Sequence, residues 1–131
     1  MGESFVKTRA MNWVLAVIHL LVGVALLFNK INEPILIKGL IVGWYWVLVG
    51  IPVFSAISLA GKEDRAFRTV VLALNWGLLL FTLLGIATAL RNGTFSVLWM
   101  IGALVFLIPA GVNIRALGSA LRQTKSSADA V

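Results

Sequence analysis

The chain has 131 residues, of which 60% are hydrophobic and only 12% are charged, with a mean hydropathy of +1.00. A soluble domain carries about twice that charged fraction. The absence of cysteine excludes disulfides, thiolate catalysis and cysteine-ligated metals, and a single histidine cannot supply two axial imidazoles to a haem. The formal charge of +6 would suggest nucleic acid as a partner of a soluble protein. Here the basic residues lie at the ends of apolar blocks, where they meet lipid headgroups, so no nucleic acid partner is expected.

Four apolar blocks are long enough to cross a bilayer, because a hydrocarbon core of about 30 Å needs roughly 20 helical residues. The predicted helices run from Met11 to Phe28, Gly39 to Ala60, Thr69 to Leu90 and Phe95 to Leu117. Short connections make consecutive helices antiparallel neighbours. The sequence therefore predicts an all-α integral membrane protein, a four-transmembrane-helix up-down bundle that forms one membrane domain over residues 1–131. Residues 118–131 are predicted to be a flexible cytoplasmic tail.

The basic residues are divided unequally between the two predicted sides of the membrane. Eight lie on the side of the termini and three on the other, namely Lys7, Arg9, Lys62, Arg65, Arg68, Arg115, Arg122 and Lys125 against Lys30, Lys38 and Arg91. The positive-inside rule then places both termini in the cytoplasm. The prediction is a multi-pass protein of the bacterial cytoplasmic (inner) membrane.

Two similar segments suggest a tandem duplication of one helical hairpin. Asn12-Trp13 recurs as Asn75-Trp76 after 63 positions, and Ile51-Pro52 recurs as Ile108-Pro109 after 57 positions. The two spacings differ by six positions. This is roughly the number of residues by which the first predicted outer loop is longer than the third. The repeats would cover 11–60 and 69–117, in the same orientation and related by an axis along the membrane normal. Chance matching of short apolar strings is the alternative.

Each copy pairs a glycine-containing helix with a short outer turn and a second helix. An example is the segment Gly43-Trp44-Tyr45-Trp46-Val47-Leu48-Val49-Gly50-Ile51, which is followed by charge at Gly61-Lys62. In this respect the chain resembles the HdeD-like acid-resistance membrane proteins, which are built of short hairpin repeats. The resemblance implies a hairpin-repeat membrane fold and little chemistry of its own.

A polar stripe is predicted on helix one and another on helix three. His19 is the only ionisable residue at mid-depth, and it shares a face with Asn12, while Asn75 and Thr82 occupy the matching positions of helix three. If the stripes face one another, Thr82 is the first expected partner of His19. The residues then either form interhelical hydrogen bonds that hold the bundle or line a polar, pH-sensitive path.

Two further sets of residues are candidates for structural roles. Gly39, Gly43 and Gly50 share one face of helix two, which favours close helix packing either within the chain or between subunits. Pro52 and Pro109 each remove a helical hydrogen bond and are candidate kinks, with a hinge as the alternative.

The groups needed for chemistry are missing. The predicted spans contain no acidic residue, no cluster of metal ligands and no nucleophile beside a base, so neither an enzyme nor a bound cofactor is expected. The first hypothesis is a non-enzymatic accessory, assembly or stress-related protein that contacts the lipid bilayer and either itself or another membrane protein. The alternative is a small oligomeric channel or transporter with a polar path along helices one and three. A protein that blocks a membrane-active toxin is a third hypothesis.

Overall fold

The computed structural model describes residues 2–29, 32–60 and 65–130, with side chains described for 5–29, 32–60 and 65–123. Within these ranges the chain forms four α-helices: α1 (Gly2–Asn29), α2 (Ile35–Ser58), α3 (Arg65–Arg91) and α4 (Val97–Ala130). The prediction of an all-helical chain with four long apolar helices is confirmed.

Each helix is long and apolar enough to cross a membrane. The candidate spans are Phe5–Asn29, Ile35–Ser58, Arg65–Arg91 and Val97–Gln123, with mean hydropathies between 2.0 and 2.3. At 1.5 Å per residue, the shortest span of 24 residues is about 36 Å long and exceeds a hydrocarbon core of about 30 Å. Helices suit this setting because they satisfy every backbone N–H and C=O internally where no water is present. The four spans indicate a multi-pass membrane protein.

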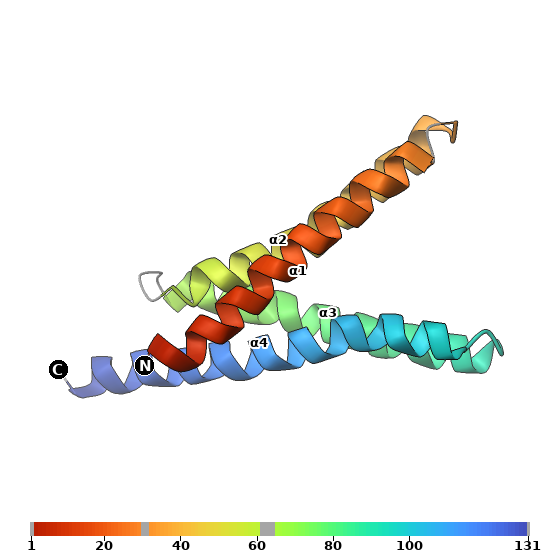
Figure 1. Ribbon diagram of the computed structural model, residues 1–131. Helices are drawn as coiled ribbons and strands as arrows, with labels where there is room; N and C mark the ends of the chain where they lie inside the picture. The colour runs from red at the N-terminus through yellow and green to blue at the C-terminus, as the bar shows by residue number, and fades with distance from the viewer. Residues whose placement is uncertain (1, 30–31, 61–64, 131) are drawn as a thin grey trace. The chain divides into compact units, whose positions relative to one another are not determined.

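The chain divides into two compact units, residues 1–60 and 61–131, and each unit is a helical hairpin. In the first hairpin α1 and α2 lie side by side, and in the second α3 and α4 do so (Figure 1). Short connections make the two helices of each hairpin antiparallel. The hairpin is therefore the packing unit of this protein.

Local sequence explains how α3 ends and α4 begins. Gly93 has a φ of +70°, and it follows the helix in the left-handed conformation that glycine adopts most readily. The Gly93 N–H donates to the Leu90 carbonyl and the Thr94 N–H to the Ala89 carbonyl at 2.9 Å, the pair of bonds that closes a Schellman motif. Ser96 then caps α4, its Oγ accepting a hydrogen bond from the Trp99 N–H at 3.2 Å.

The C-terminal helix is longer than predicted. The structure continues α4 to Ala130, whereas the sequence predicted a flexible tail from residue 118. Leu117 and Ala120 are buried, at 0% and 1% exposure, so apolar residues at helical spacing continue beyond the predicted end of the span. Because leucine, alanine and arginine are good helix formers, the single glycine at 118 does not end the helix.

The helix bounds show how the two suggested repeats compare in register. The first predicted connection, Asn29 to Lys38, ended too late, because α2 already begins at Ile35. Asn12 lies 17 residues before the end of α1 (29 − 12) and Asn75 lies 16 before the end of α3 (91 − 75), so these two match in position. Pro52 lies 17 residues after the start of α2 (52 − 35), but Pro109 lies 12 after the start of α4 (109 − 97). The helix bounds thus align the asparagines of the suggested repeat and set the prolines five residues apart.

Candidate functional site

The polar residues predicted on α1 lie on its buried face. Asn12 is fully buried and His19 is 8% exposed, and Ala16 and Gly23 on the same face are also buried. The Asn12 Nδ2 donates a hydrogen bond to the Thr8 carbonyl at 3.0 Å. The His19 Nδ1 lies 2.7 Å from the Leu15 carbonyl oxygen, a distance that assigns the proton to Nδ1 in this contact. Both side chains therefore bond to the preceding turn of their own helix.

The matching residues of α3 behave in the same way. Asn75 is fully buried and Thr82 is 7% exposed. The Asn75 Nδ2 donates to the Val71 carbonyl at 3.0 Å, and the Thr82 Oγ1 donates to the Leu78 carbonyl at 2.8 Å. Such back-bonding to the carbonyl four residues earlier is how a polar side chain is satisfied within one membrane helix. The predicted contact between His19 and Thr82 would join the two hairpins and stays a prediction.

One polar contact joins the two helices of the second hairpin. The Asn113 Nδ2 donates a hydrogen bond to the Asn75 Oδ1 at 3.1 Å, and Asn113 is 2% exposed. The sequence interpretation did not include Asn113 among the candidates, although a signal was present. Asn113 is spaced by helical turns from Ala110, Leu117 and Ala120, all of which are buried.

The glycines in close contact are not those that the sequence singled out. A Cβ added at Gly23 would lie 3.0 Å from Cγ of Tyr45 on α2, and one added at Gly85 would lie 3.2 Å from Trp99 on α4. In contrast, a Cβ at Gly39 or Gly43 would meet no atom within 4 Å. Within each hairpin, therefore, an aromatic side chain of one helix packs on a glycine of the other.

The face of α2 predicted for helix packing is open within its hairpin. Gly39 and Gly43 are exposed, and large apolar side chains on the same helix are exposed with them, Leu36 at 72%, Leu40 at 66% and Trp46 at 71%. Gly50, the third member of the predicted set, is half-buried, and its nearest atom belongs to Phe54 of the same helix. The open part of the face is thus the half of α2 nearest the connection.

The two prolines lie inside helices, as predicted. Pro52 is buried within α2 and Pro109 is half-buried within α4, and both helices continue without interruption. Near Pro52 the Ser55 Oγ donates to the Ile51 carbonyl at 2.7 Å and the Ser58 Oγ donates to the Ser55 carbonyl at 2.9 Å. These are bonds of serine hydroxyls to carbonyls of their own helix, and neither is made to Leu48, whose carbonyl Pro52 leaves without its usual helical donor.

No group of three or more histidine, cysteine, aspartate or glutamate side chains that could hold a metal ion occurs within the part of the chain that the structure describes. The chemistry of the buried polar residues is that of amides, hydroxyls and one imidazole bonded to backbone carbonyls.

Comparison with known proteins gives no match: no family model, no curated protein and no solved structure is significantly similar to this chain. The resemblance to HdeD-like proteins therefore stays a prediction.

Proposed function

We propose that this protein is a non-enzymatic accessory or assembly protein of the bacterial cytoplasmic membrane, with both termini in the cytoplasm, that acts through helix–helix contacts. The observation that supports this proposal best is the open face of α2. Gly39 and Gly43 are exposed at a four-residue spacing, and nothing in their own hairpin lies within 4 Å of an added Cβ. Small residues at this spacing let a second helix backbone approach closely, so that dispersion and Cα–H···O contacts hold the pair.

The internal bonding of the polar stripe favours the same function. Asn12, His19, Asn75 and Thr82 each bond to a carbonyl of the preceding turn. A path for ions or solutes needs side chains that offer their polar groups to the passing species. Polar groups engaged with their own helix serve packing better than conduction, which ranks the channel below the accessory role.

We further propose that the two hairpins arose by duplication. The best support is the agreement of Asn12 with Asn75: both are fully buried, both donate to the carbonyl four residues earlier, and both lie at the same distance from the end of their helix to within one residue. The prolines are not equivalent in this register, so their similarity is better attributed to chance.

The accessory role is tested by Gly43→Leu, with Gly77→Leu as the matched control. Gly77 on α3 is also exposed, and a Cβ there also meets no atom within 4 Å. Both variants add the same side chain to an open helix surface, but only Gly43→Leu obstructs the proposed contact face. Chemical crosslinking in native membranes, followed by purification in mild detergent and mass determination, should show that Gly43→Leu loses a complex that the wild type and Gly77→Leu retain. Equal recovery of the complex from all three proteins would rule out this face as the contact.

A further inference from the structure

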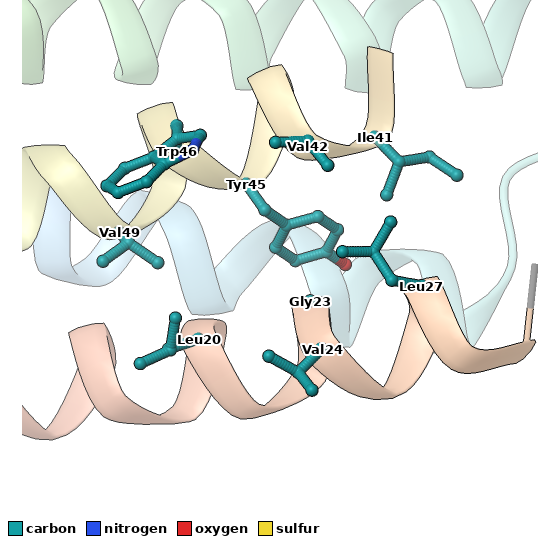
Figure 2. Close-up of a pocket in the computed structure, with 9 residues that line it drawn as sticks. All are labelled: Leu20, Gly23, Val24, Leu27, Ile41, Val42, Tyr45, Trp46 and Val49. Carbon is teal, nitrogen blue, oxygen red and sulfur yellow. The ribbon is translucent and has the colours of Figure 1, made fainter. Parts of the chain in front are cut away.

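A cavity of about 160 Å³ lies between α1 and α2 in the first hairpin. The side chains around it are apolar apart from the Tyr45 hydroxyl and the Trp46 indole N–H, and Figure 2 shows them: Leu20, Gly23, Val24, Leu27, Ile41, Val42, Tyr45, Trp46 and Val49. All of them except Val49, which lies just past the middle of α2, belong to the halves of the two helices nearest their connection. The cavity therefore lies in the half of the membrane on the side of the α1–α2 connection.

Tyr45 places one polar group in this apolar setting. Its ring packs on Gly23, with ring atoms only 3.0 and 3.1 Å from where a Cβ at Gly23 would lie. Side chains on a helix lean toward its N-terminus, which for α2 is the end at the connection. In Figure 2 the ring accordingly extends in this direction, and its oxygen lies on the side of Leu27, two residues before the end of α1.

The Tyr45 hydroxyl has no hydrogen-bond partner among residues 5–29, 32–60 and 65–123. A tyrosine with its ring in an apolar site normally finds a partner for its O–H. Since α2 is about 36 Å long and the hydrocarbon core about 30 Å, the end of α2 lies close to the boundary with the headgroups. The hydroxyl is directed toward that boundary, where the ester carbonyls of phospholipids supply acceptors.

We propose that this cavity binds an acyl chain of a phospholipid from the leaflet on the side of the α1–α2 connection, and that the ester carbonyl of that chain accepts a hydrogen bond from the Tyr45 hydroxyl. The size of the cavity fits this ligand, because an apolar cavity of about 150 Å³ holds one benzene-sized group. A short stretch of an acyl chain fits that space. A helix from a second copy of the chain fits the site less well, because its backbone carbonyls are already bonded within the helix and offer Tyr45 no free acceptor. The site lies beside the contact face proposed for Gly39 and Gly43 and shares Trp46 with it, whereas Tyr45 and Val49, on which its test depends, are not part of that face.

The test uses the full-length protein reconstituted with an equimolar mixture of diacyl (ester) and dialkyl (ether) phosphatidylethanolamine of equal chain length. After transfer to mild detergent, native mass spectrometry counts the phospholipids retained on each chain. The wild type should retain one phospholipid and prefer the ester form about fivefold, the size expected for one hydrogen bond. Tyr45→Phe should retain a phospholipid without this preference, because it keeps the ring on Gly23 and removes only the hydroxyl.

Two valine variants of α2 test the cavity itself. Val49→Phe fills the cavity and should lose the retained phospholipid. Val47→Phe makes the same change at a residue that is 47% exposed and does not line the cavity, and it should behave as the wild type. Equal retention of ester and ether lipid by the wild type would overturn the role of Tyr45, and equal retention by Val49→Phe and Val47→Phe would overturn the site. Formation of a lipid-free dimer that Val49→Phe disrupts would show that a second copy occupies the cavity, and would also overturn the proposal.

Discussion

Asn113 of α4 donates a hydrogen bond to Asn75 of α3, and this bond joins two residues that lie 38 positions apart in the sequence. Both side chains are buried, and Asn75 also donates to the Val71 carbonyl of its own helix. The Asn75 amide thus donates from its NH₂ group within α3 and accepts with its oxygen from α4. A bond of this kind fixes the register of two membrane helices, which apolar contacts alone specify weakly because lipid tails offer similar contacts.

A double-mutant cycle on this pair measures its contribution to stability. We expect Asn113→Leu and Asn75→Leu each to lower the free energy of unfolding, because each leaves one amide without its interhelical partner. The double variant should lose less than the sum of the two. The expected coupling energy is about 0.6 kcal/mol and at most about 1.7 kcal/mol, the range found for hydrogen bonds between membrane helices. Reversible unfolding in mixed micelles provides the measurement, and strictly additive losses would show that the bond contributes nothing to stability.

The contact between Gly23 and Tyr45 predicts a difference between two glycine substitutions. Gly23→Ala places a methyl group 3.0 Å from the Tyr45 ring, and the contacting atom is the base of the ring, so α1 and α2 must separate slightly. Gly77→Ala meets no atom within 4 Å and should gain the higher helix propensity of alanine. We expect Gly23→Ala to be less stable than Gly77→Ala by about 1–3 kcal/mol, the typical cost of overpacking. Thermal unfolding in detergent measures the difference, and equal stabilities would mean that the helices accommodate the methyl group freely.

Much of the fold could be predicted from the sequence because the membrane imposes simple rules. Each apolar block had to form a helix, and short connections had to make hairpins. Most of the helix ends were therefore predicted to within a few residues. The end of α4 was missed because the small and polar residues at the C-terminal end of the chain were taken as a flexible tail, although Leu117 and Ala120 continue the buried face. The first connection was overestimated because Lys38 was treated as an interfacial residue outside the helix, whereas α2 begins at Ile35.

The candidate site was predictable only in part, for a physical reason. Helical spacing placed Asn12 and His19 on one face of the first helix, and Asn75 and Thr82 on one face of the third. All four residues are buried. Spacing within a helix cannot show which helix lies opposite, so the partner of Asn75 was missed. The same limit applies to glycine: Gly39 and Gly43 have the spacing typical of packing, but Gly23 and Gly85 face aromatic side chains across their hairpins.

The charge distribution predicts the orientation of the protein in the membrane. The chain has no cysteine, so single cysteines can be introduced at Ala66, near the start of α3, and at Asn92, in the second hairpin connection. Both positions are exposed. A membrane-impermeant maleimide added to intact cells should label Asn92→Cys at once and Ala66→Cys only after the membrane is permeabilised. Labelling of Ala66→Cys in intact cells would reverse the orientation, and equal labelling of both would indicate a dual topology.

His19 decides between the accessory role and a conducting path, and His19→Leu separates the two. The His19 Nδ1 contacts the Leu15 carbonyl, and that carbonyl also accepts a backbone N–H from the next helical turn, so the loss of the imidazole leaves the Leu15 carbonyl satisfied. We therefore expect the variant to insert, to keep its assembly state and to change in stability by less than about 1 kcal/mol. Thr82→Val is the matched control, because it removes a hydroxyl that likewise bonds to its own helix. Two measurements are needed, thermal stability in detergent and ion or solute flux from proteoliposomes between about pH 5 and 8, the range in which a histidine changes charge. The accessory role predicts no flux above that of empty liposomes for all three proteins, whereas a flux in the wild type that His19→Leu abolishes without loss of stability would establish the conducting path.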